Sequence, residues 1–248
     1  MAWSEAEYTN VVAAWLAALA TADRLSDPAA RIRARRLIGH AYAEMGRHDE
    51  AVAHLNRALD MIAEHPDPLE QAHTHRQLAR AWDGRRDNRS ALHHAIQALR
   101  RYRAVGQPIW EAYALNQVGW YAAHLGHPAI GRAHCLAALA LHRRHTNLDG
   151  EANTLDSLAY IDQVSGDHDH AAEYYERALS LYQALGNTAQ CADILDNLGR
   201  VHTAAGRPHQ AHKAWLEALA YYREQGRMHD AERVRRQVDG DADDRASG

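Results

Sequence analysis

The sequence predicts an all-α protein of about twelve helices, stacked as helical hairpins with a 40-residue repeat. First, the pair Ala-Leu recurs at a constant interval, beginning at Ala18, Ala58, Ala98, Ala138, Ala178 and Ala218. Second, small residues stand seven residues before five of these pairs (Ala51, Ala91, Gly131, Ala171 and Ala211) and twelve residues before those (Gly39, Ala79, Gly119, Ala159 and Gly199). Antiparallel helices pack closely where small side chains let the backbones approach. These residues therefore mark the predicted helix crossings.

Short turns separate the two helices of each repeat, as between Gly46 and Asp49. Glycine can take the left-handed conformation that closes the first helix, and Asp can cap the second. Pro128 and Pro208 stand near the starts of second helices, where a missing N–H is harmless. Arg86 occupies the glycine position of repeat two, so we expect that turn to be strained or differently shaped.

The start of the chain aligns with the second helix of a repeat whose first helix is absent, since Val11 and Trp15 stand at the register positions of Ala51 and Leu55. We therefore expect the chain to be a fragment of a longer protein. Its unmatched apolar face predicts that some of Val12, Trp15 and Leu19 are exposed or paired with another copy. Dimerisation through this half repeat is the corresponding prediction.

The expected organisation is one domain over residues 1–238 and a disordered tail over 239–248, which is acidic and rich in small residues. The domain divides into a half repeat (1–29), five repeats (30–67, 68–107, 108–147, 148–187 and 188–227) and a capping helix (228–238). Three arginines in that last helix indicate a polar cap on the stack.

One repeat closely resembles the tetratricopeptide repeat (TPR) family, whose pattern runs Leu-Gly, Tyr, Ala and Ala-Leu across a helical hairpin. The matching residues are Leu37-Ile38-Gly39-His40-Ala41-Tyr42, Gly46, Ala51 and Ala58-Leu59. The resemblance covers residues 30–225 and implies a right-handed superhelix, an α-solenoid. Each unit is about six residues longer than the usual TPR, which indicates longer helices.

Several short sequence segments resemble a more specific group, the large Streptomyces antibiotic regulatory protein (SARP) family. They are Ala2–Glu7, Asn10–Ala14, Ala114–Trp120, Thr154–Leu158 and Ala214–Leu219. That family carries a winged-helix DNA-binding region, an activator domain and an ATP-binding NB-ARC switch, and ends in a TPR array. The resemblance implies a C-terminal sensor or regulatory module of a transcriptional regulator. A stand-alone cytoplasmic TPR adaptor that binds peptide segments is the alternative.

The composition argues against several other classes of protein. The chain has 24% charged residues and a net charge of −4, without the clustered basic face that nucleic acid requires. It contains neither a phosphate-binding Gly-x-x-x-x-Gly-Lys-Ser/Thr loop nor a helix with a basic flank that reads DNA. The apolar run Val11–Ala20 is too short to span a bilayer, and the segment before it is acidic rather than basic. Cys135 and Cys191 have no metal or redox spacing, which indicates a reducing cytoplasm.

The 19 histidines suggest a metal site, and a metal-dependent enzyme is the least favoured alternative. Their closest pairs lack a third ligand, so we expect solvated surface histidines, no metal and no other cofactor. Neither Gly-x-Ser-x-Gly nor His-Glu-x-x-His occurs, and Cys135 stands in a large-residue core slot. We therefore expect that the protein is not an enzyme.

The resemblance to TPR arrays implies that the first helices line a ligand groove. Projecting the register gives Arg36, His40, Arg76, Arg80, Tyr113, Asn116, Trp120, Asp156, Tyr160, Asp196, Asn197 and Arg200, with Arg33, His73, Asn153 and Asp193 beside them. This series runs from basic, through aromatic and amide, to mainly acidic. It predicts a groove for a protein or peptide segment, or for another domain of the same full-length protein.

Overall fold

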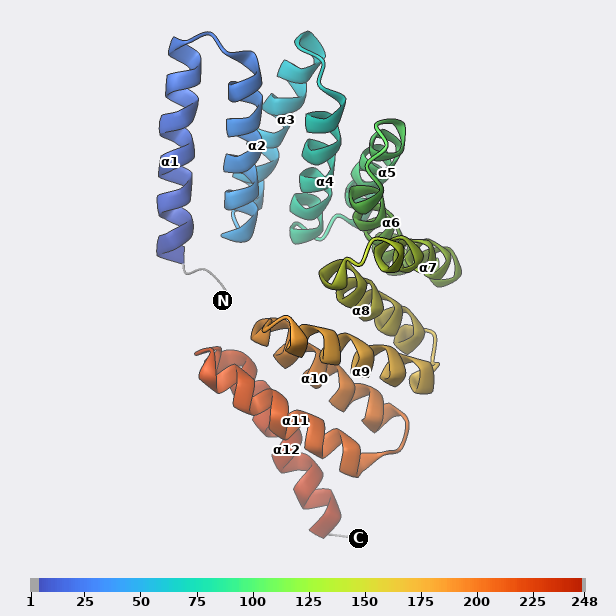
Figure 1. The fold of residues 1–248 in the computed structure, drawn as a ribbon. Helices are drawn as coiled ribbons and strands as arrows, with labels where there is room; N and C mark the ends of the chain where they lie inside the picture. Colours follow the sequence, from blue (N-terminus) through green and yellow to red (C-terminus); the bar gives the residue numbers. More distant parts are fainter. Residues whose placement is uncertain (1–4, 247–248) are drawn as a thin grey trace. The chain divides into compact units, whose positions relative to one another are not determined.

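The computed structural model describes residues 5–246 and places them in twelve helices joined by short turns, with no strand among the described residues (Figure 1). The predicted all-α fold is confirmed. The helices are α1 (Glu5–Arg24), α2 (Pro28–Glu44), α3 (His48–Glu64), α4 (Pro68–Gly84), α5 (Asn88–Ala104), α6 (Pro108–His124), α7 (Pro128–Arg144), α8 (Leu148–Val164), α9 (His168–Ala184), α10 (Thr188–Ala204), α11 (Pro208–Glu224) and α12 (Met228–Ala246).

The chain divides into two compact units, with the boundary inside α7 between Leu141 and His142. We call them the N-terminal unit and the C-terminal unit. Each is a run of stacked helices, and in a repeat array each hairpin contacts only its neighbours, so no shared core ties distant repeats together. The single repeat domain expected over residues 1–238 stays a prediction.

Ten of the connections between helices contain a residue with positive φ, and apart from the connection between α3 and α4 these residues are evenly spaced along the chain. Glycine fills seven of these positions, and Ser26, Arg86 and Thr146 fill the others. The expectation that the Arg86 turn is differently shaped is wrong: φ is 61° at Arg86 and 72° at Gly46. The backbone keeps its hydrogen bonds there, with the Arg86 N–H donating to the Asp83 carbonyl over 2.7 Å. Arg86 therefore adopts the left-handed backbone conformation, which is sterically costly for a residue with a Cβ.

Asp and Asn side chains cap six of the described helices by accepting a backbone N–H of the first turn. They are Asp27, Asp67, Asp87, Asn147, Asp167 and Asn187. Asp49 differs from the expectation: the cap of α3 is Arg47, which makes no side-chain cap bond. Asp49 lies in the first turn of α3, where its charge favours the positive end of the helix dipole.

The small residues lie where the two helices of a hairpin cross, as predicted. A Cβ added to Gly39 on α2 would lie 2.7 Å from Cγ of Leu55 on α3. A Cβ on Gly131 would lie 2.6 Å from the carbonyl oxygen of Gly119. Cys135 is fully buried at its crossing, and burial raises the pKa of its thiol to about 12, so it is a core residue.

Helix α1 packs on α2 with the residues that were expected to be exposed. Val12 and Leu19 are 7% and 8% exposed, and Trp15 is partly buried beside them. The expectation was wrong for Val12 and Leu19 because a second helix also packs against the first helix of the following repeat. The uncovered face lies to one side and includes Ala18, which is exposed, whereas its register equivalent Ala58 is fully buried. Dimerisation through this face stays a prediction.

The last helix continues to Ala246, so most of the expected disordered tail is helical; residues 247 and 248 lie outside the described residues. The segment contains few helix breakers, with glycine at Gly240 and no proline, and once a helix has formed, each added residue costs little. No helix in the described part of the chain is long and apolar enough to cross a membrane.

Candidate ligand groove

Three predicted arginines of the N-terminal unit, Arg36, Arg76 and Arg80, lie on the neighbouring first helices α2 and α4. We call them the arginine cluster. Two of them form ion pairs between these helices. Nε of Arg36 lies 2.7 Å from Oε2 of Glu70, and Nη2 of Arg80 lies 2.6 Å from Oε1 of Glu44. The two glutamates therefore neutralise part of the predicted basic end of the groove.

The projection of the groove from the sequence does not include Glu44 and Glu70. Their spacing in the sequence could have placed both glutamates in the groove, because Glu44 stands four residues after His40 and Glu70 stands three residues before His73. On a helix those spacings place side chains on one face.

Arg76 has a different environment from the other two arginines. Its guanidinium carbon lies 4.8 Å from the centre of the Trp110 ring, and its buried Nε has no hydrogen-bond partner. Burial lowers the pKa of Arg76, the nearby hydroxyl of Tyr102 raises it, and the charge of Arg80 lowers it again. No carboxylate is paired with Arg76 in the part of the chain that the structure describes.

Two histidines border the arginine cluster and are neutral at pH 7. Burial lowers the pKa of His73 to about 4, with Arg36 and Arg76 acting in the same direction. His73 Nδ1 lies 2.7 Å from the hydroxyl of Tyr102. Burial also lowers the pKa of His40. The predicted groove residue His40 therefore contributes a polar ring and no charge.

The aromatic part of the predicted groove lies on α6. Tyr113 and Trp120 are both partly buried; Tyr113 packs near Trp110 with ring centres 5.7 Å apart. The prediction that Asn116 lines the groove is wrong. Asn116 is only 5% exposed and accepts a hydrogen bond from the thiol of Cys135 over 3.4 Å. Its side chain turns toward Cys135 on α7, inside the α6–α7 hairpin, so it is not a groove residue, although Arg36 and Arg76 share its register position.

In the C-terminal unit the predicted groove residues lie on α8 and α10. Asp156 on α8 is partly buried, and burial together with the nearby Asp193 raises its pKa to about 7. Tyr160 is partly buried too, and burial raises its pKa. Asn197 is partly buried on α10 and Arg200 is exposed.

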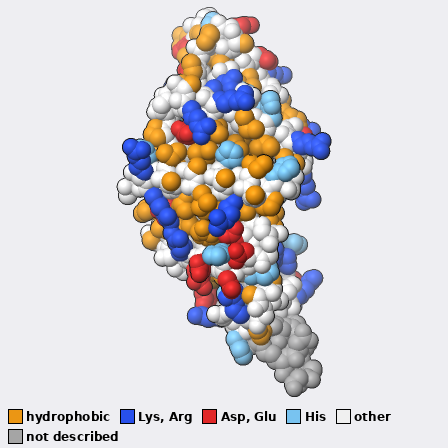
Figure 2. Space-filling view, turned by 90° about the vertical axis from the view of Figure 1, so that its right-hand side faces the viewer, with side chains coloured by type: hydrophobic (Ala, Val, Ile, Leu, Met, Phe, Trp, Pro, Cys, Tyr) orange, Lys and Arg blue, Asp and Glu red, His pale blue; other side chains and the backbone are white. Residues whose placement is uncertain are grey.

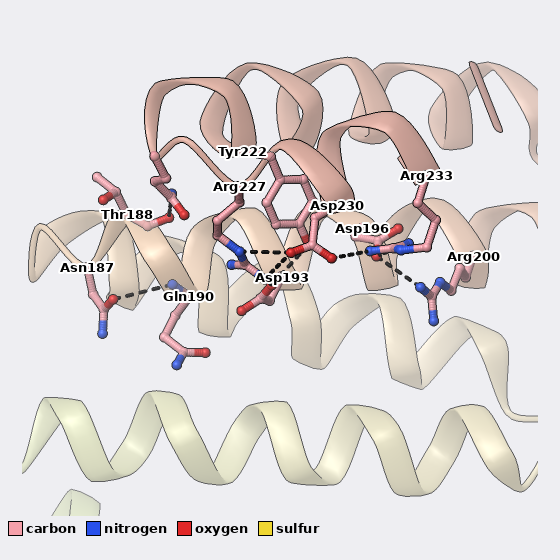
Figure 3. A network of polar contacts seen from close by, with 11 residues as sticks. Asn187, Thr188, Gln190, Asp193, Asp196, Arg200, Tyr222, Arg227, Asp230 and Arg233 are labelled. Atoms are coloured by element: carbon pink, nitrogen blue, oxygen red, sulfur yellow. Dashed lines mark hydrogen bonds and ion pairs between the residues drawn. The ribbon is translucent and has the colours of Figure 1, made fainter. Parts of the chain in front are cut away.

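Asp193 and Asp196 are held mainly by residues that follow α10 in the chain, as Figure 3 shows. Oδ2 of Asp196 accepts from Arg200 over 3.0 Å and lies 2.8 Å from Nη1 of Arg233 on α12. Oδ1 of Asp193 accepts from Nη2 of Arg227 and from the hydroxyl of Tyr222, both over 2.9 Å. The acidic end predicted from the sequence is thus largely neutralised within the chain.

The sequence alone interprets Arg233 only as part of a polar cap. Its register position is that of Arg33, His73, Tyr113, Asn153 and Asp193, which the projection places in the groove. If α12 is counted as the first helix of a sixth repeat, the same projection places Arg233 in the groove.

Three histidines differ from the solvated side chains that were expected, whereas others, such as His127 and His209, are exposed. His75, His142 and His202 are 7%, 0% and 6% exposed. Burial lowers the pKa of His75 to about 3 and that of His142 to about 4. Neutral imidazoles fit inside hairpins when one ring nitrogen finds a partner, as Nδ1 of His75 does 3.0 Å from Nδ1 of His94. Among the side chains that the structure describes, no three from His, Cys, Asp or Glu are grouped to hold a metal ion.

The two units therefore present different chemistry along their first helices. The N-terminal unit carries guanidinium groups beside indole and phenol rings, which suits acidic and apolar groups of a ligand. The C-terminal unit carries carboxylates that are mostly paired. On the face drawn in Figure 2, Lys and Arg side chains stand among exposed hydrophobic ones, and Asp and Glu side chains gather on another part of the same face.

Comparisons with known proteins agree with this architecture. A curated relative, "Regulatory protein AfsR" of Streptomyces griseus, is 28% identical over 243 residues, which cover 86% of this chain and 25% of that protein. The chain thus spans about a quarter of the length of that relative. BtubC from P. vanneervenii is a similar solved structure, with a TM-score of 0.73, 20% identity, and coverage of 88% of this chain and 92% of that one.

Another similar structure is the Rap conjugation gene regulator of the plasmid pLS20 in complex with the Phr* peptide. Its TM-score is 0.72 at 14% identity, with 84% of this chain and 57% of that chain covered. The profile described as "Tetratricopeptide repeat" matches residues 31–104 and 150–224, together more than half of the chain. The chain belongs to the tetratricopeptide repeat family.

Proposed function

We propose that this chain is the sensor or regulatory module of a SARP-type transcriptional regulator, and that it acts by binding a protein or peptide segment along its first helices. The observation that carries the proposal is the similarity to a Streptomyces regulatory protein over 86% of this chain. In the SARP family TPR arrays follow the DNA-binding and nucleotide-switch regions. The DNA-binding and ATP-binding steps therefore belong to other parts of such a regulator.

The chemistry of the N-terminal unit supports a peptide or protein ligand. Arg76 and Trp110 supply the residue types that dominate binding energy at protein interfaces. The Rap regulator, which shares the architecture, was solved with a bound peptide. Here the ligand is either a separate protein or another domain of the same full-length regulator.

The proposed module is cytoplasmic and not an enzyme. Its two cysteines are both free and buried, as in a protein that keeps its thiols reduced. The pKa of Cys135 is raised by burial, whereas a nucleophilic thiol needs a lowered one.

The first test is the coding sequence upstream of Met1. A phosphate-binding loop and a winged-helix region there support the regulator, and their absence favours the stand-alone adaptor. The second test compares wild type with the Trp120→Ala variant in the full-length protein. Transcriptional output should change while the intrinsic affinity of the DNA-binding region stays the same.

The matched control is Leu216→Ala, which removes an exposed apolar side chain from the second helix α11. It should leave transcriptional output unchanged, because second helices do not line the proposed groove. If Trp120→Ala regulates like wild type while Leu216→Ala does not, the ligand site lies away from the first helices and the proposed groove is wrong.

A further inference from the structure

The guanidinium of Arg76 lacks the partner that the two other arginines of the cluster have. Arg36 and Arg80 each meet a glutamate within 2.7 Å, whereas Arg76 has the Trp110 ring on one side and a neutral hydroxyl, that of Tyr102, as its polar contact. Its Nε is buried without a hydrogen bond. The side chain as a whole remains partly exposed, so a ligand can still reach it.

A charge in this position is costly for the folded protein. Taking a guanidinium out of water is repaid only by good geometry with an opposite charge and by bonds to its remaining donors. The Trp110 face offsets part of the cost through a cation–π contact. The buried Nε–H group of Arg76 has no hydrogen-bond acceptor, and buried donors without an acceptor are rare in proteins.

The surroundings make the cost larger. Arg80 and Arg36 both act on Arg76 as like charges, and His73 and His40 on the same two helices are neutral at pH 7. On α6, Trp110 is the residue against Arg76. Glu70 and Glu44 are already engaged by the other two arginines. The arginine cluster therefore has one more cation than it has carboxylates.

We propose that Arg76 binds a carboxylate of the partner, with Arg80 as a second donor and the Trp110 ring as the wall beside it. The inference rests on the proposed function only in taking that carboxylate from a peptide or protein. Arg80 suits the second role because it is 44% exposed and its pair with Glu44 lies at the surface, so it can turn toward a ligand. A planar guanidinium with free N–H groups matches a carboxylate in a bidentate geometry.

The test compares Arg76→Met with Arg100→Met, which changes an exposed arginine on α5 of the same unit. Thermal unfolding is measured in sodium succinate and in sodium chloride at matched ionic strength. Succinate should raise the melting temperature of wild type and of Arg100→Met more than chloride does, and this difference should vanish in Arg76→Met. Without carboxylate, Arg76→Met should unfold at the same temperature as wild type or higher, because an unpaired buried charge has been removed.

Two peptides identify the source of the carboxylate. Acetyl-Ala-Glu-Glu-Ala-amide offers only side-chain carboxylates, and acetyl-Ala-Ala-Ala-Ala with a free C-terminus offers only the terminal one. Binding is followed by tryptophan fluorescence, to which Trp110 contributes. The preferred peptide should bind Arg76→Met at least about tenfold more weakly than wild type, the loss expected for charge-assisted hydrogen bonds.

Two results would overturn the inference. One is a wild-type protein that responds to succinate and both peptides no more than to chloride. The other is an Arg76→Met variant that unfolds well below wild type and keeps its carboxylate response, which would make Arg76 a structural residue. Carboxylate binding through Arg76 without any effect on transcription would instead count against the proposed function alone. A regulator that depends on Trp120 but does not bind carboxylates would count against this inference alone.

Discussion

Glu70 on α4 pairs with two arginines of the preceding first helix at once, Arg36 at 2.7 Å and Arg33 at 3.5 Å. The two pairs differ in their exposure to solvent. The side chains of Arg36 and Glu70 are 14% and 13% exposed, whereas that of Arg33 is 61% exposed. One carboxylate thus joins repeats one and two through a largely buried contact and a solvated one.

Removing the buried half of this contact should destabilise the protein, and removing the solvated half should not. Arg36→Met leaves Glu70 largely buried with only the exposed Arg33 nearby, and we expect a loss of about 2 kcal/mol, below the value for a fully dry pair. Arg33→Met should cost less than about 0.5 kcal/mol. Chemical denaturation of the two variants measures both. Equal costs would mean that burial does not distinguish the two pairs.

Overpacking a helix crossing should be costly while the same change on the helix surface is not. Ala178 on α9 is fully buried, so Ala178→Leu should lose roughly 1–3 kcal/mol through strain in its hairpin. Ala184 ends the same helix and is exposed, and Ala184→Leu is the matched control. Denaturant midpoints give both values. If both variants are equally stable, the assigned crossing is not tightly packed.

The Arg86 turn offers a stabilising substitution. Arg86 is exposed and has φ of 61°, so Arg86→Gly should relieve the steric cost of a Cβ and stabilise the protein by about 0.5–1 kcal/mol. Arg100 is an exposed residue inside α5, where Arg100→Gly should destabilise by about 1 kcal/mol through lost helix propensity. Thermal unfolding of both variants should therefore move in opposite directions. A drop in melting temperature for Arg86→Gly would show that the turn carries no strain.

Asp156 should make the protein less stable as the pH rises. Burial and Asp193 raise its pKa to about 7, from an ordinary value of 3.8. Between those values the folded state holds a proton that the unfolded state has released, so stability falls as the pH rises from about 4 to about 7 and then levels off. Asp156→Asn keeps the neutral shape and should be more stable than wild type by roughly 2–4 kcal/mol at pH 8.

The control for Asp156 is its behaviour at pH 4, where wild type and the Asn variant should be nearly equal. The buried histidines act in the opposite direction, because the low pKa values of His75 and His142, about 3 and 4, favour the folded state above their ordinary 6.5. Both proteins share that effect, so the difference between them isolates Asp156. A constant difference from pH 4 to pH 8 would contradict the assignment.

Dimerisation through α1, which the sequence predicts, is tested by sedimentation equilibrium. Ala18 lies on the uncovered face, so Ala18→Glu should shift the chain toward monomer. Ala20 is exposed on another side of the helix, and Ala20→Glu should leave the association unchanged. A wild-type chain that stays monomeric at every concentration would show that the uncovered face of α1 does not pair two copies.

The helices and their crossings could be predicted from the sequence because close packing of two helices restricts the size of the residues at the crossing. A small residue such as Gly39 opposite a large one such as Leu55 repeats wherever two backbones must approach. The turns could be predicted only in part, because the left-handed conformation was inferred from glycine, yet Arg86, Ser26 and Thr146 adopt it as well.

The candidate site was predicted less well, for a physical reason. Register shows which side chains share a face, but not which charge of one helix reaches a charge of the next. The contacts of Arg36 with Glu70 and of Asp196 with Arg233 depend on how closely neighbouring first helices approach. Asn116 was misplaced because its position on the helix leaves open whether it turns to the groove or to the thiol of Cys135.

The left-handed turns return at every connection between helices except that between α3 and α4, whereas the small residues at the crossings return once for each hairpin. A recombination event that deletes or duplicates a whole repeat, such as 148–187, would restore both patterns at its junctions. An event that deletes a single first helix with its turn would preserve the spacing of the turns. It would also place two second helices next to each other, so that the small residues of each would no longer face a first helix. Gene length in such proteins is therefore free to vary, but only in whole hairpins, and a half-hairpin change should fold locally and fail to stack.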